Sequence, residues 1–131
     1  MKPEDKKLLL KDLSARLPYN VKCYNSKYRS DLAEEIICIT VNYNHPCIQL
    51  GTYLYKLEQV KPYLFPFSSM TDEEKEEYCQ LQQRVIYNSK GVVNEDITKY
   101  INWCYKKHLD INNLIPMGLA IDATGLNLYK L

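Results

Sequence analysis

Long hydrophobic runs are missing from this 131-residue sequence. The first apolar stretch covers only residues 8–10, which is shorter than the hydrophobic region of a signal peptide. No later segment approaches the roughly 20 consecutive apolar residues that a membrane-spanning helix needs. These absences argue against secretion and membrane insertion, so we expect a cytoplasmic protein with no membrane partner.

Glycine is also scarce, with four residues in the whole chain, so the backbone has few places where it could wrap a phosphate group. The sequence contains no phosphate-binding loop of the G-x-x-x-x-G-K type, no H-E-x-x-H zinc motif, no G-x-S-x-G motif and no C-x-x-C pair. We therefore predict no cofactor, no metal and no catalytic residue. An enzyme with an unfamiliar site stays open as an alternative.

Neither sign of charge dominates, because 17 basic side chains are balanced by 16 acidic ones and the formal net charge is +1. Such a balance gives no whole-molecule attraction to nucleic acid or to a membrane surface. The five cysteines are odd in number and lack the spacing of a disulfide framework. A chain of this length and ordinary composition is expected to form one domain over residues 1–131.

Three segments have the sequence pattern of helices. The first begins with a proline followed by acidic residues, and its leucines recur at helical spacing. The second begins with Thr71 and Glu74 in the arrangement of a capping box, and the third begins with Asn94, a favourable N-cap residue. We therefore predict helices over residues 3–16, 71–87 and 94–108, with short further elements in 111–131.

Between the first and second helices the hydrophobic period changes to two over residues 20–60, which indicates β-strands. One face of the clearest strand is expected to carry Ile37, Ile39, Val41 and Tyr43. Pro62 and Pro66 are expected to end the β region. The pattern predicts an α+β protein, a small antiparallel β-meander packed with about three helices, with closure into an SH3-like barrel as an option.

Two parts of the chain resemble a known group of proteins. The segments Lys61-Pro62-Tyr63-Leu64 and Ser68-Ser69-Met70-Thr71, the latter followed by glutamates, are similar to a segment of small uncharacterised proteins from gut Bacteroides-type bacteria and their phages. The later segment 115–120 is similar to the tail of the same proteins. The resemblance implies a bacterial or phage origin, and it implies no activity.

Tyrosine is unusually abundant, with 12 residues against two phenylalanines and one tryptophan. Its ring and hydroxyl suit both half-buried core positions and contact surfaces. Basic charge is concentrated in residues 1–30, which hold eight basic and three acidic side chains. A solvated helix and an exposed turn would explain these charges. The alternative is a partner or nucleic-acid surface made of Lys22, Tyr24, Lys27, Tyr28 and Arg29, which could extend to Tyr53 and Tyr55.

Other groups of residues have the composition of a site but a simpler structural explanation. His45 and Cys47 flank a proline in a turn, and nothing in the sequence brings the thiol to the imidazole. Cys104 and His108 stand four apart on one helical face, but they continue an apolar stripe and lack further metal ligands. A solvated turn and a solvated helix start account for the acidic residues Asp31, Glu34, Glu35 and those within 72–77.

Three functions are compatible with these observations. The working hypothesis is a non-catalytic protein-binding module, a phage or mobile-element accessory protein that acts on a host protein, because the chain is small, rich in tyrosine and without catalytic motifs. A nucleic-acid-binding accessory protein would use the basic and aromatic residues of 22–29. A small enzyme with an unrecognised site is the third.

Overall fold

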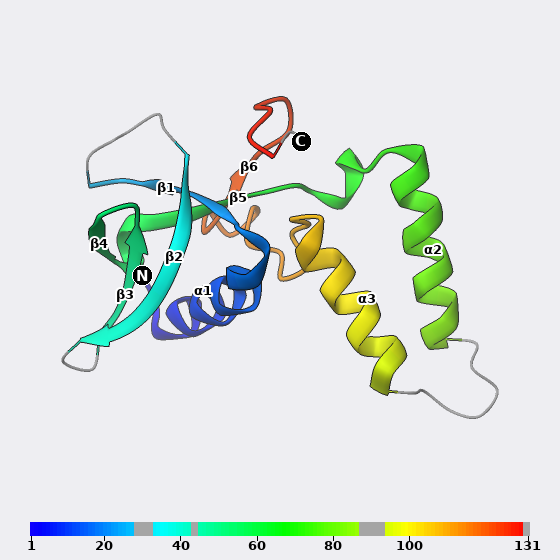
Figure 1. Cartoon of the computed structure of the whole chain (residues 1–131), viewed down its shortest axis with the longest axis horizontal. Coiled ribbons are helices and arrows are strands. Elements are labelled where there is room, and N and C mark those ends of the chain that lie inside the picture. The colour runs from blue at the N-terminus through cyan, green and yellow to red at the C-terminus, as the bar shows by residue number, and fades with distance from the viewer. Residues whose placement is uncertain (28–32, 43–44, 87–93, 130–131) are drawn as a thin grey trace.

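The computed structural model describes residues 1–27, 33–42, 45–86 and 94–129, and it shows an α+β protein (Figure 1). The described α-helices are α1 (Pro3–Arg16), α2 (Asp72–Ile86) and α3 (Asn94–Lys106), so the three predicted helices are confirmed. None of them is long and apolar enough to cross a membrane. Short 3₁₀ turns are present at η1 (Leu17–Tyr19), η2 (Leu57–Gln59) and η3 (Phe67–Ser69). The strands are β1 (Lys22–Asn25), β2 (Glu34–Asn42), β3 (His45–Leu50), β4 (Tyr53–Lys56), β5 (Val60–Leu64) and β6 (Ile121–Asp122).

The sheet is open and mixed. Its strand order is β4-β3-β2-β1-β5-β6, and every neighbouring pair is antiparallel except β5 and β6, which are parallel. The described sheet is not closed, because β4 pairs with neither β5 nor β6, and the SH3-like barrel stays a prediction. Because β5 pairs with β1 instead of returning to β4, β4 and β6 stay as the two edges of the described sheet. The predicted meander is present in β2, β3 and β4, which pair consecutively.

A β-bulge at Ile37 changes which residues of β2 face the core. Ile36 and Cys38 pair with adjacent residues of β3, so Ile37 is an extra residue in the ladder. Ile36 is consequently 4 % exposed and Ile37 is 55 % exposed, while Ile39 packs against the core. The prediction that Ile37 and Ile39 share one face was wrong, because an inserted residue shifts the alternation by one. Tyr43, expected on that face, lies outside the described residues.

Strand β5 continues the β region past Pro62, where we expected it to end. The amide of Ser26, just after β1, donates to the carbonyl of Gln59 at 2.8 Å. Because bonded and non-bonded pairs alternate in an antiparallel ladder, Pro62 falls opposite Cys23 in a non-bonded pair. The nitrogen of Pro62 therefore faces away from β1 and toward the side of β5 that pairs with β6. That pairing begins at Tyr63, one residue after the proline. The missing N–H interrupts neither ladder.

The core lies between one face of the sheet, here called the inner face, and a layer made by α1 and residues 109–120 (Figure 1). Leu9 and Leu13, which the helical spacing placed on the apolar side of α1, are fully buried. They share the core cluster with Ile48 of β3 and Leu114 of the C-terminal layer. The helix also buries two charged residues, Asp12 and Arg16.

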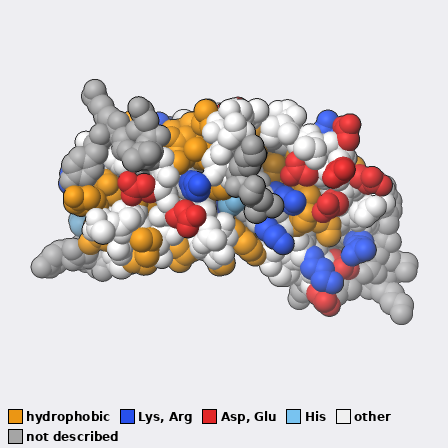
Figure 2. All heavy atoms as spheres, turned by 45° about the horizontal axis from the view of Figure 1, so that its top comes forward, with side chains coloured by type: hydrophobic (Ala, Val, Ile, Leu, Met, Phe, Trp, Pro, Cys, Tyr) orange, Lys and Arg blue, Asp and Glu red, His pale blue; other side chains and the backbone are white. Residues whose placement is uncertain are grey.

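Helices α2 and α3 form a hairpin that projects away from the sheet (Figure 1). Its contact surface is aromatic: the ring of Tyr78 lies 5.5 Å from Phe67, 5.6 Å from Tyr100 and 6.1 Å from Trp103. The hydroxyl oxygens of Tyr78 and Tyr100 are 2.9 Å apart. Side chains of both charge signs cover the outside of this end of the molecule (Figure 2). Part of the abundant tyrosine therefore serves packing between helices.

The chain between α3 and β6 folds into consecutive turns. The buried carboxylate of Asp110 accepts hydrogen bonds from the amides of Leu114 at 2.7 Å and Ile115 at 2.9 Å. These turns place Leu114 and Leu119 in the core. Among the described residues of the predicted C-terminal elements, only the two-residue strand β6 is regular secondary structure.

Candidate functional site

The structure does not gather the predicted basic and aromatic residues into one surface. The described residues include Lys22, Tyr24 and Lys27 but not Tyr28 and Arg29. The Nζ of Lys22 donates to the carbonyl of Leu128 at 2.6 Å, so this charge is engaged by the C-terminal segment. Tyr24 is half-buried and lies opposite the exposed Lys61 of β5, and Lys27 is exposed beyond the end of β1. A smaller basic and aromatic surface therefore remains near Tyr24.

Tyr53 and Tyr55 occupy different environments on β4. Tyr55 is 2 % exposed and belongs to the core, so it cannot extend a binding surface. Tyr53 is 58 % exposed at the start of the strand. Strands β2 and β3 separate β4 from β1, and Tyr53 is accordingly distant from Lys22 in the sheet.

Strands β2, β3 and β4 present exposed apolar side chains on the face opposite to α1. We call this face the outer face and define it by Ile37, Cys38, Cys47, Gln49 and Leu54. Cys38, Gln49 and Leu54 lie opposite one another across the three strands, and the thiol of Cys38 donates to Oε1 of Gln49 at 3.0 Å. Ile37 and Leu54 are 55 % and 52 % exposed, so no described element covers them.

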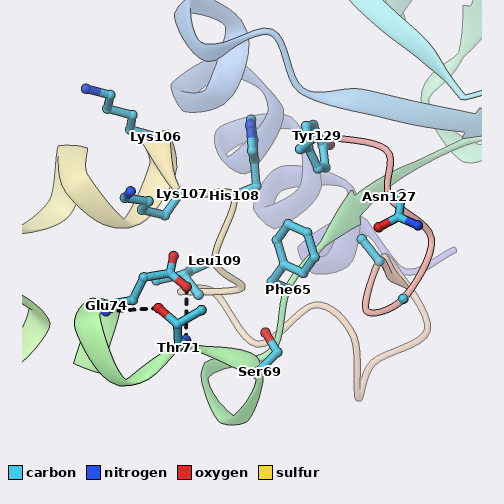
Figure 3. Close-up of a pocket in the computed structure, with 12 residues that line it drawn as sticks. Phe65, Ser69, Thr71, Glu74, Lys106, Lys107, His108, Leu109, Asn127 and Tyr129 are labelled. Atoms are coloured by element: carbon cyan, nitrogen blue, oxygen red, sulfur yellow. Dashed lines mark hydrogen bonds between the residues drawn. The ribbon is translucent and has the colours of Figure 1, made fainter. Parts of the chain in front are cut away.

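A pocket of about 600 Å³ lies between the α2–α3 hairpin and the C-terminal segment, and we call it the tail pocket (Figure 3). Its apolar lining comes from Phe65, Leu109, Ala123 and the ring of Tyr129. Phe65 directly follows β5, Leu109 follows α3, and Ala123 and Tyr129 follow β6. No local sequence motif could therefore have predicted the pocket.

The polar lining of the tail pocket comes from the start of α2 and the end of α3. The Oγ1 of Thr71 accepts from the amide of Glu74 at 3.1 Å, and Oε1 of Glu74 accepts from the amide of Thr71 at 3.0 Å. The predicted capping box is thus confirmed. Lys106 and Lys107 add two ammonium groups, neither of which forms an ion pair with a described residue.

Tyr129 fastens the C-terminal segment to the sheet beside the pocket. Its hydroxyl accepts a hydrogen bond from the amide of Lys22 and donates one to the carbonyl of Tyr63, both at 2.8 Å. In the alternating pattern of an antiparallel ladder, Lys22 and Tyr63 would be the next pair to bond directly, so the hydroxyl bridges β1 and β5 at this position. Its ring stacks on the imidazole of His108 with the centroids 3.7 Å apart. Sequence reasoning missed this residue because 107 positions separate it from Lys22.

His108 lies in the turn just after α3 and adopts the left-handed conformation, with φ at 58°. Its Nδ1 is buried and has no hydrogen-bond partner among the described residues. Burial, with a smaller contribution from the positive charges of Arg16 and Lys22, lowers the pKa of the imidazole from 6.5 to about 4. The ring is therefore neutral at physiological pH in the folded protein.

We expect the stability of the protein to fall as His108 is forced to accept a proton. Because the pKa is lower in the folded state, this contribution is complete above about pH 6.5 and is lost as the pH falls toward about 4. Allowing for partial solvent exposure of the ring, we expect a loss of about 1 kcal/mol between about pH 7 and pH 5. Urea unfolding over this range would measure it.

The matched variant is His108→Asn, because asparagine tolerates the left-handed conformation and does not titrate. Its free energy of unfolding should change less than that of the wild type over the same pH range. Equal slopes in the two proteins would assign the pH dependence to other groups.

The Cys–His pairs and the acidic candidates lie in ordinary structural surroundings. The thiol of Cys47 is 3.9 Å from the backbone carbonyl oxygen of His45. Cys104 is fully buried, which raises the pKa of its thiol to about 11. The described part of the chain contains no group of three or more His, Cys, Asp or Glu side chains arranged to hold a metal ion. Glu34 and Glu35 are consecutive on β2 and so point to opposite faces, while Asp31 is not described.

Comparisons with protein-family models, with curated proteins and with solved structures found no match.

Proposed function

We propose that this protein is a non-catalytic protein-binding module that contacts its partner through the outer face. The main support is that Ile37 and Leu54 are 55 % and 52 % exposed on one face of a sheet whose edge strand is β4. Fully burying a large aliphatic side chain contributes about 1.5–3 kcal/mol. Burial of both residues against a partner would therefore supply a substantial part of the binding free energy.

The edge of the sheet supports the same proposal. Within the described sheet β4 pairs with β3 alone and forms an edge, and a sheet edge can add an extended segment of a partner. Tyr53, which is 58 % exposed at the start of β4, alternates with Leu54 and therefore does not belong to the outer face. Exposed aliphatic residues and an open edge together favour a protein partner.

The nucleic-acid alternative has less support. Its surface is reduced because Lys22 donates to the carbonyl of Leu128, Tyr55 is buried and β4 lies apart from β1. The resemblance to proteins of gut Bacteroides-type bacteria and their phages suggests where the partner should be sought. We propose a host protein of such bacteria as the target, bound by an accessory protein of a phage or mobile element.

A tagged pull-down from a lysate of such a host, with and without nuclease, tests the proposal. We expect a protein recovered in stoichiometric amount in both arms. The double variant Ile37→Lys/Leu54→Lys should weaken binding at least about tenfold, because it replaces two apolar contacts by charges that a partner would have to desolvate. Affinity would then be measured with the purified partner.

The matched control is Met117→Lys/Leu126→Lys, which introduces the same charges at two exposed apolar residues outside the outer face. Both double variants should unfold at nearly the wild-type urea concentration, because all four positions are exposed. Equal loss of binding in the two variants would remove the outer face as the interface. Recovery that disappears with nuclease would favour the nucleic-acid alternative.

A further inference from the structure

The tail pocket is separate from the outer face of the sheet and has the size of a small-molecule site. Its volume of about 600 Å³ falls within the range of roughly 300–1,000 Å³ that such sites occupy. Three parts of the chain meet there: the start of α2, the end of α3 and residues 123–129 (Figure 3). The bonds of Tyr129 to Lys22 and Tyr63 hold the last of these in place.

One wall of the pocket is aromatic. The rings of Phe65 and Tyr129 meet edge to face, with centroids 5.8 Å apart and planes at 61°. His108 stacks on Tyr129, and Leu109 and Ala123 complete the apolar lining. Aromatic rings favour edge-to-face and offset-stacked contacts, and these rings are already held in position by packing and hydrogen bonds. Such a wall favours a planar ring as ligand.

The polar side of the pocket carries an excess of positive charge. Lys106 and Lys107 line the pocket together with one carboxylate, that of Glu74, which already accepts a hydrogen bond from the amide of Thr71. The hydroxyl of Thr71 accepts the amide of Glu74, which leaves its own proton to donate. The carbonyl end of α3 explains a preference for lysine there. It does not explain why two consecutive lysines line an aromatic cavity.

We propose that the tail pocket binds a small planar ring that carries an acidic group, such as an aryl phosphate or an aryl carboxylate. The ring lies against Phe65 and Tyr129. The acidic group accepts charge-assisted hydrogen bonds from Lys106 or Lys107 and a further bond from Thr71. Because His108 is neutral at physiological pH, the lysines supply the positive charge at this site.

The experiment is an NMR titration of the full ¹⁵N-labelled chain with phenyl phosphate. We expect saturable shifts of the amides of Phe65, Leu109 and Asn127. Benzyl alcohol, which has the ring without the charge, and inorganic phosphate, which has the charge without the ring, should each bind at least about tenfold more weakly. These comparisons use the wild-type protein and need no variant to fold.

The variant Lys106→Gln/Lys107→Gln should weaken the binding of phenyl phosphate about tenfold. The matched control Lys75→Gln/Lys99→Gln removes two exposed lysines of the same hairpin outside the pocket lining and should bind within about twofold of the wild type.

Shifts that do not saturate, equal weakening in both variants, or benzyl alcohol binding as tightly as phenyl phosphate would each overturn the proposal. The pocket variant should still retain its protein partner in the pull-down. The two proposed sites can therefore fail independently.

Discussion

Replacing Asp12 with alanine is expected to lower the free energy of unfolding by about 3–5 kcal/mol. Asp12 and Arg16 of α1 are both 0 % exposed, and Nε of Arg16 donates to the two carboxylate oxygens of Asp12 at 2.7 and 3.0 Å. The alanine variant would leave the guanidinium buried without its counter-charge. That uncompensated charge is the main source of the expected cost.

The same pair joins α1 to the C-terminal part of the chain. The side-chain amide of Asn112 donates to Asp12 at 3.0 Å, and Nη2 of Arg16 donates to the carbonyl of Leu109 at 2.6 Å. The guanidinium lies over the ring of Tyr105, 4.9 Å from its centroid. Nη1 of Arg16 has no hydrogen-bond partner among the described residues. Removal of Asp12 would therefore leave the guanidinium with its hydrogen bond to Leu109 and no carboxylate.

Urea unfolding followed by circular dichroism would measure the change. The double variant Asp12→Leu/Arg16→Met removes both charges and should recover most of the loss, because apolar residues of similar volume often replace a buried pair without cost. The variant Glu58→Ala breaks the exposed ion pair with Lys6 and should cost less than about 1 kcal/mol. A similar small cost for Asp12→Ala would contradict the importance of the buried pair.

Replacing Asp110 with alanine is the second large expected effect, a loss of about 2–4 kcal/mol. The carboxylate of Asp110 is the acceptor for the amides of Leu114 and Ile115, and the residue is 7 % exposed. Without it, these two amides lose their acceptor in a poorly solvated place, and each unsatisfied buried group costs about 1–3 kcal/mol. The turns that hold Leu114 in the core would loosen.

Amide hydrogen exchange distinguishes this mechanism from a general loss of stability. In the alanine variant the amides of Leu114 and Ile115 should exchange faster, and urea unfolding should report the lower stability. The variant Asp110→Asn keeps one acceptor oxygen and should fall between the wild type and alanine. If Asp110→Asn were as unstable as Asp110→Ala, the negative charge rather than the hydrogen bonds would be the stabilising feature.

The helices were predictable because their signals are local. The leucine spacing and first-turn proline of α1, and the Thr71–Glu74 capping box of α2, each involve residues within a few positions of one another. The burial of Asp12 and Arg16 was not predictable in the same way. A charged residue on the apolar side of a helix can be buried only if distant groups satisfy it, and here these groups are Leu109 and Asn112.

The strands were predictable as a region and less so in detail. Alternation located β2 and β3, but the bulge at Ile37 reversed the faces on one side of it. Pro62 indicated an end to the β region, whereas its place in a non-bonded pair allowed β5 to form. Both depend on the partner strand, which periodicity in one segment does not describe.

The candidate sites show the same division. Local pattern sufficed to predict the α+β class, the three helices and the meander. Only the tertiary structure decided that Lys22 is engaged by Leu128, that Tyr55 is core, and that Ile37 and Leu54 share an exposed face. Helix and strand signals arise from neighbours in the chain. Strand order, buried charge pairs and pockets instead depend on burial and hydrogen bonding summed over the whole fold.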